Sequence, residues 1–93
     1  MKMVMVIYNE AIDVEVMEVL DRSGLVNYTK ITRVSGKGTT SGTHLGNDIW
    51  PGLNYILYVA CDDTQAKQFV SGVTDLRKTL GKEGVKAFIM PLE

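Results

Sequence analysis

The sequence is short of several residue types, and each shortage excludes a class of protein. Its single cysteine, Cys61, rules out an internal disulfide framework and fits a reducing compartment. Ten lysines and arginines against eleven aspartates and glutamates leave a net charge of -1, so no basic surface points to nucleic acid. No apolar run reaches the roughly 20 residues of a membrane span, and residues 1–8 lack the length and cleavage site of a signal peptide. We therefore expect a cytoplasmic protein without direct membrane insertion.

The rest of the composition is that of a packed globular protein. Hydrophobic residues make up 45% of the chain, charged residues make up 23%, and there are only two prolines. A length of 93 residues is enough for one small domain and too little for two independent cores. We expect a single domain over residues 1–93.

Four segments have the composition of β-strands, since they are rich in apolar, β-branched and aromatic residues. They cover residues 2–8, 28–34, 53–61 and 85–90. We expect Pro91 to stop the last of these strands.

Two helices are predicted between these strands from apolar residues at helical spacing. Asn9 caps the first helix and Gly24 ends it, whereas the acidic cluster at 62–64 opens the second and Gly81 closes it. The order β-α-β-β-α-β is the ferredoxin-like α+β pattern, in which two helices cover one face of an antiparallel four-stranded sheet.

The second face of this sheet also carries apolar residues. In the segment 53–61, Leu57 and Val59 belong to one alternation set, and Ile56 and Tyr58 belong to the other. Because the helices cover only one face, we expect the other face to meet further subunits. The alternative is that tyrosine and alanine at these positions simply tolerate exposure.

A glycine-rich segment at 36–52 separates two strands that a few residues could join. It holds five glycines, the only histidine of the chain, His44, and the only tryptophan, Trp50. Long loops of this kind are usually functional. We expect a mobile recognition loop.

The whole chain resembles the PII signalling-protein family, and in particular its short, divergent PII-like members. The resemblance rests on the opening strand K-x-V-x-x-I-Y, on the sequence 34–38 (VSGKG) with the loop after it, and on the closing sequence 86–93 (KAFIMPLE). It implies a homotrimer with a cleft between neighbouring subunits. It also implies a non-catalytic regulator that senses a small effector in this cleft and acts on a target protein, such as a transporter or an enzyme, through the T-loop-like segment 36–52.

The resemblance also implies which residues bind the effector and the partner. Gly36, Lys37, Gly38 and Lys86 match the positions that approach a nucleotide. The implied partner-binding residues of the loop are Thr40, Leu45 and Trp50, the last of which has the alternative role of anchoring the loop against a subunit.

Two departures from the family pattern affect the nucleotide. Gly52 stands where the family places a basic residue that touches the triphosphate, and Thr40 replaces a glutamine used for Mg²⁺ and 2-oxoglutarate. The chain also ends at Glu93, before the C-terminal arginines of the family's phosphate site. A ligand with fewer phosphates needs fewer cations. AMP, ADP and ATP all remain candidate ligands, and AMP needs the fewest cations in its binding site.

The loop also suggests a metal-binding alternative, linked to metal tolerance or efflux. His44 and Asp48 are four residues apart, and imidazole with carboxylate suits a divalent ion such as Zn²⁺. Cys61 is a third candidate ligand if it faces the cleft. Each residue also has a plainer interpretation, His44 as a polar loop residue and Cys61 as a small buried strand residue.

An enzymatic function has less support. The only arginines are Arg22, Arg33 and Arg77, none of which lies in a phosphate-cradling loop, and no nucleophile and base are paired by the sequence. We therefore expect no catalysis.

Overall fold

The computed structural model describes residues 1–35, 53–80 and 84–93, and the elements follow the predicted order. The strands are β1 (Lys2–Asn9), β2 (Thr29–Val34), β3 (Asn54–Cys61) and β4 (Val85–Pro91). The helices are the 3₁₀ turn η1 (Glu10–Ile12), α1 (Asp13–Arg22) and α2 (Asp63–Leu80).

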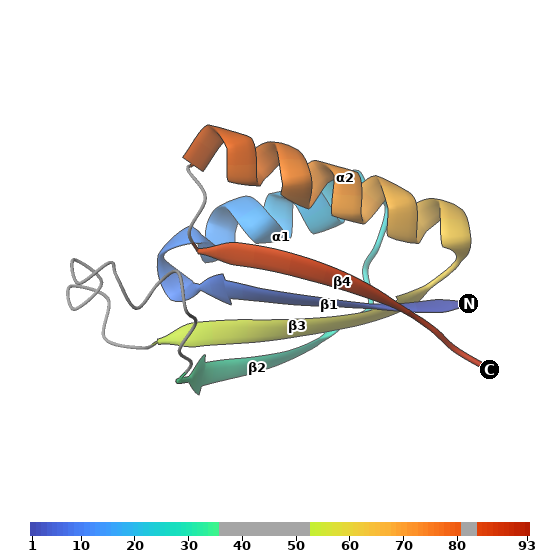
Figure 1. Ribbon diagram of the computed structural model, residues 1–93, viewed down its shortest axis with the longest axis horizontal. Helices are drawn as coiled ribbons and strands as arrows, with labels where there is room; N and C mark the ends of the chain where they lie inside the picture. Colours follow the sequence, from blue (N-terminus) through green and yellow to red (C-terminus); the bar gives the residue numbers. More distant parts are fainter. Residues whose placement is uncertain (36–52, 81–83) are drawn as a thin grey trace.

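The four strands form one antiparallel sheet in the order β2-β3-β1-β4. The central strand β1 pairs with β3 on one side and with β4 on the other, so β2 and β4 are the edge strands. Both helices lie on the same side of this sheet (Figure 1). The ferredoxin-like α+β prediction is confirmed.

The core lies between the sheet and the helices. Alternate residues of β1 and β3 point into it, because side chains of a strand alternate between the two faces. The buried residues of the two central strands are Val4, Val6, Tyr8, Leu57, Val59 and Cys61. The helices bury Val16, Val19, Leu20, Ala66, Phe69 and Val73 against them.

The first helix begins in two steps. The side chain of Asn9 accepts a hydrogen bond from the backbone N–H of Ala11 at 2.8 Å, so Asn9 caps η1 and not α1, which starts at Asp13. At the other end, Gly24 has a φ of +75°, the left-handed conformation that glycine adopts easily. The backbone N–H of Leu25 then donates to the carbonyl of Leu20, which closes the helix as predicted.

The second helix is opened by a reciprocal cap. The carboxylate of Asp62 accepts from the N–H of Gln65 at 2.7 Å, and the amide oxygen of Gln65 accepts from the N–H of Asp62 at 3.4 Å. The predicted start is confirmed. The predicted stop, Gly81, lies outside the described residues.

Strand β4 continues one residue further than the sequence suggested. Pro91 was expected to stop it, but Pro91 is part of the strand and pairs with Lys2 of β1. A proline lacks the N–H that a central strand needs, yet it is tolerated on an edge strand, where only one side is paired.

The face of the sheet away from the helices, which we call the open face, is largely apolar. The register places Met3, Met5 and Ile7 of β1 on it, opposite Ala60, Tyr58 and Ile56 of β3. Of the edge strands, Ile31, Phe88 and Met90 lie on this face and are 43%, 45% and 37% exposed. This exposure fits the expectation that the open face meets another surface.

Candidate functional site

One end of the sheet gathers the strand termini that flank both undescribed segments (Figure 1). Segment 36–52 follows β2 and precedes β3, and segment 81–83 precedes β4. Backbone hydrogen bonds hold this end together: the N–H of Asn9 donates to Gly84 O at 2.7 Å, and the N–H of Glu10 donates to Leu53 O at 3.3 Å. We call this end of the sheet the loop end.

Lys86 is the predicted effector-binding residue that the structure describes. It lies on β4 opposite Ile7, so its side chain belongs to the open face, two residues from Gly84 at the loop end. The side chain is exposed, and the described parts of the chain offer it no ion pair. A cation in this position is available to an anionic group.

The other predicted residues of the loop lie outside the described residues. They are Gly36, Lys37, Gly38, Thr40, His44, Leu45, Asp48 and Trp50. Their roles therefore stay predictions.

Cys61, the third candidate metal ligand, lies in the core and away from the loop end. It is 3% exposed and belongs to the core on the helix side of the sheet. It also ends β3 opposite Lys2, whereas the loop end is at Asn54, the other end of the same strand. Burial, and then the charges of Asp62 and Asp63, raise the pKa of the thiol, so the neutral form that binds metals poorly is favoured. Residues 1–35, 53–80 and 84–93 contain no group of three or more metal-binding side chains.

The structure contains a polar cluster near the loop end that the sequence did not predict. Lys30 Nζ donates to Asp13 Oδ1 at 2.9 Å, and the Tyr8 hydroxyl donates to the same oxygen at 2.6 Å. Burial, and then the hydrogen bond and charge of Asp13, raise the pKa of Tyr8. The alternation of residues along β2 could have indicated this cluster. It places the charged Lys30 on the helix side of the sheet, opposite the buried Leu57.

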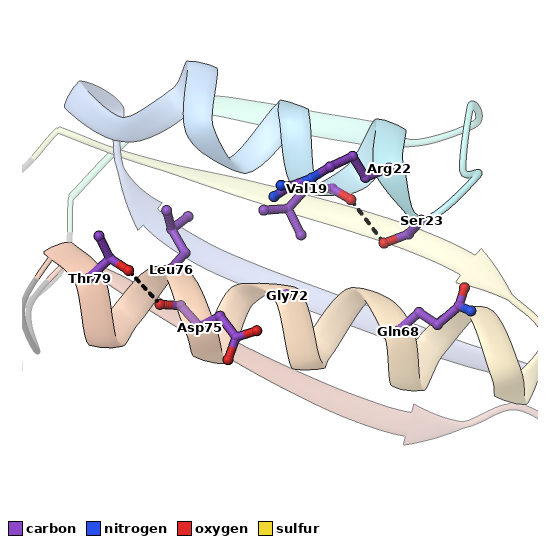
Figure 2. Close-up of a pocket in the computed structure, with 8 residues that line it drawn as sticks. All are labelled: Val19, Arg22, Ser23, Gln68, Gly72, Asp75, Leu76 and Thr79. Atoms are coloured by element: carbon purple, nitrogen blue, oxygen red, sulfur yellow. Dashed lines mark hydrogen bonds between the residues drawn. The ribbon is translucent and has the colours of Figure 1, made fainter.

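A groove of about 470 Å³ runs between the two helices, on the opposite side of the molecule from the open face. Figure 2 shows Arg22 and Ser23 on its α1 side and Gln68, Asp75 and Thr79 on its α2 side. Both hydroxyls are used locally, since Ser23 donates to Val19 O at 2.9 Å and Thr79 donates to Asp75 O at 3.1 Å. Lys86, the predicted effector residue that the structure describes, does not line this groove.

The fold and the exposed cation at its loop end define a small ferredoxin-like α+β protein with an open apolar sheet face. The chain belongs to the P-II family, because the family model described as nitrogen regulatory protein P-II matches it over residues 1–93. Proteins of this family are generally non-enzymatic signalling proteins, and they are typically trimers that interact with target proteins. No match is found among the curated proteins. No helix of the described residues is long and apolar enough to span a membrane.

Solved structures of PII-like proteins have the same fold. CPII from Thiomonas intermedia, bound to ADP, AMP and acetate, superposes with a TM-score of 0.74 at 20% identity, over 96% of this chain and 82% of that chain. The same protein bound to ADP, AMP and bicarbonate gives 0.74 at 18% identity, over 98% and 88%. A PII-like signalling protein from Thermus thermophilus gives 0.69 at 18% identity, over 95% and 81%.

Proposed function

We propose that this protein is a non-catalytic PII-like regulator that binds an adenine nucleotide at the loop end and transmits its presence to a partner protein. The observation that carries the proposal is the position of Lys86. Its free ammonium group lies near the loop end of the sheet, on the same face as the exposed apolar residues Phe88 and Met90.

The proposed assembly is a homotrimer formed through the open face. Ile31, Phe88 and Met90 are exposed in the isolated chain, and contact with a second subunit would remove their apolar surface from water. Lys86 would then lie at the border of the contact, in a cleft to which two subunits contribute. A charged side chain at the polar rim of an apolar contact stays accessible to a ligand.

The proposed effector is an adenosine mono- or diphosphate. CPII, which has the same fold, has been solved with ADP and AMP together with acetate or bicarbonate. In this chain the cations proposed for the phosphates are Lys86 and the undescribed Lys37, a small number that suits one or two phosphates better than three. A small carboxylate-like anion beside the nucleotide is part of the same proposal.

The proposed output passes through segment 36–52. It leaves the sheet at the loop end, where β2 ends and β3 begins, so a ligand at Lys86 lies on the same end of the sheet as both of its attachment points. We propose that Thr40, Leu45 and Trp50 contact the partner, a transporter or an enzyme of the cytoplasm.

A thermal-denaturation panel tests the effector. Ligands that bind only the folded protein stabilise it by RT ln(1 + [L]/Kd), about 2.7 kcal/mol at a hundredfold excess over Kd. We expect AMP or ADP to raise Tm by several degrees, with a further rise when bicarbonate is added. The absence of any shift with AMP, ADP and ATP at millimolar concentration would reject nucleotide sensing.

The metal-binding alternative is tested in the same panel. It depends on His44 and Asp48, and no observation on the described residues favours it. A rise in Tm with Zn²⁺ that His44→Ala abolishes would favour the alternative over the nucleotide.

A further inference from the structure

The pairing of β2 with β3 is interrupted close to the loop end. Ile31 pairs with Ile56 and the next pair is Val34 with Asn54, so two residues of β2 face the single residue Tyr55. One of the two, Arg33, has a φ of +59°, which is unusual for a residue other than glycine. A bulge of this kind leaves a residue without a ladder partner. The backbone ladder alone therefore holds the end of β2 less firmly than the rest of the strand.

A cluster of side chains lies beside this bulge, on the helix side of the sheet. The Lys30 ammonium is 5.6 Å from the ring centroid of Tyr55 and 5.8 Å from that of Tyr28, and it donates to Asp13 at 2.9 Å. Tyr8 donates to the same carboxylate, and its ring meets that of Tyr55 edge to face, with centroids 5.8 Å apart. We call these five residues the Lys30 cluster.

The Lys30 cluster connects the two strands that flank segment 36–52. Lys30 belongs to β2, which ends before the segment, and Tyr55 belongs to β3, which begins after it. Asp13, in the first turn of α1, also holds β2 through Lys30 and β1 through Tyr8. The Lys30 and Asp13 side chains are only 19% and 30% exposed, so solvent screens this ion pair less than an ordinary surface pair.

The same cluster lies one strand position from Lys86 in the sheet, with the cluster on the helix side and Lys86 on the open face. Tyr8 pairs with Tyr55 on one side and with Val85 on the other, and Lys86 occupies the following position of β4. A displacement of Tyr8 therefore reaches β4 through its direct partner Val85, and a displacement of Tyr55 reaches β4 through Tyr8.

We propose that Lys30 is a positioning residue of the effector site. By joining the part of β2 before the bulge to Tyr55 and to Asp13, it sets the position of β2 relative to the start of β3 at the loop end and thereby the affinity for the nucleotide. This inference rests on the proposed function for its ligand, but its geometric part concerns the folded chain alone.

The test uses the full chain and four variants. Lys30→Met keeps the long apolar stem and removes the ammonium group, whereas Lys30→Arg keeps the charge. Asp13→Asn keeps the shape of the acceptor and removes its charge. Lys67→Met is the control, because it removes an exposed lysine of α2 that is outside the Lys30 cluster.

The first readout is amide hydrogen exchange without ligand. We expect exchange at residues 32–35 and 53–55 to be roughly tenfold faster in Lys30→Met than in Lys67→Met, since local opening depends on local contacts. Unchanged exchange at these residues would overturn the inference, whether or not the protein binds a nucleotide.

The second readout is the Kd for ADP, measured by calorimetry at a temperature where every variant is folded. We expect Kd to rise about fivefold or more in Lys30→Met and Asp13→Asn, as for a typical coupling between sites, and to recover in Lys30→Arg. A purely structural role would lower Tm and leave the Kd of the folded protein unchanged, and that result would also overturn the inference. A third outcome is that the wild-type protein binds no nucleotide while hydrogen exchange changes as expected. The proposed function and the link from Lys30 to affinity would then both be wrong. The role of Lys30 in positioning the strand ends would still hold.

Discussion

A Cβ atom on Gly72 would lie 2.5 Å from Cγ1 of Val19, so the two helices are in contact where α2 has no side chain. Val19 is 3% exposed and Gly72 borders the groove between the helices (Figure 2). The close contact keeps α1 and α2 together as one layer over the sheet.

Gly72→Ala is expected to destabilise the protein by up to about 2 kcal/mol. The added methyl group overfills the contact, at a cost of about 1–3 kcal/mol, and the better helix propensity of alanine offsets about 1 kcal/mol of it. Urea unfolding measures the difference, with the exposed Ser71→Ala as the control on the same helix. In Val19→Ala the clashing atom is absent, so adding Gly72→Ala there should cost less. Equal costs in both backgrounds would contradict the contact.

Tyr8 predicts how stability depends on alkaline pH. Burial, and then the hydrogen bond to Asp13, raise the pKa of Tyr8 above its ordinary value of 10.0, so the folded state keeps a proton that the unfolded state releases. The raised pKa contributes fully to the free energy of unfolding below pH 10. Above pH 10 this contribution falls by about 1.4 kcal/mol per pH unit. We expect Tyr8→Phe to be less stable than wild type by about 1 kcal/mol at pH 7, because a hydrogen bond is lost. This difference should shrink between pH 10 and pH 11. A difference that stays constant over this range would contradict the assignment.

The backbone conformation of Arg33 predicts which substitutions this position tolerates. Its φ of +59° favours glycine and asparagine and is costly for β-branched residues. We expect Arg33→Gly and Arg33→Asn to be as stable as wild type or more stable, and Arg33→Val to be less stable by about 1–2 kcal/mol. Thermal unfolding compares the three variants. If valine is tolerated as well as asparagine, this residue does not have the left-handed conformation in solution.

The open face predicts the effect of a charge on assembly. Phe88 is 45% exposed on the open face and Val14 is 68% exposed on α1, so the two offer a matched pair of apolar surface positions. We expect wild type and Val14→Glu to be trimers by light scattering and Phe88→Glu to have a lower mass, since a buried unpaired charge is costly. A monomeric wild type, or a trimeric Phe88→Glu, would exclude assembly through this face.

Local patterns were enough to predict the elements of the fold. The helical spacing of Ala66, Phe69 and Val73 predicts their burial, and the structure buries these three residues, whereas Leu80 of the same pattern is 44% exposed. Pro91 was assigned wrongly because its tolerance depends on whether β4 is an edge strand, which is a property of the whole sheet.

The Lys30 cluster could not be predicted from the sequence, for a different reason. Asp13 and Lys30 are 17 residues apart and belong to different elements, so no spacing rule joins them. Their contact depends on how α1 packs over β2. Lys86 was assigned from the family resemblance, and the structure adds its place on the open face near the loop end.

Calorimetric titration of ADP into the wild-type protein and Lys86→Met tests the central claim most directly. The account predicts one ADP bound per subunit in the wild type and a Kd raised about tenfold or more in Lys86→Met, since a charge-assisted contact to phosphate contributes about 1.5–3 kcal/mol. The exposed-lysine control Lys67→Met should bind as the wild type does. An unchanged Kd in Lys86→Met, or no heat of binding in the wild type, would contradict a nucleotide site at the loop end of this sheet.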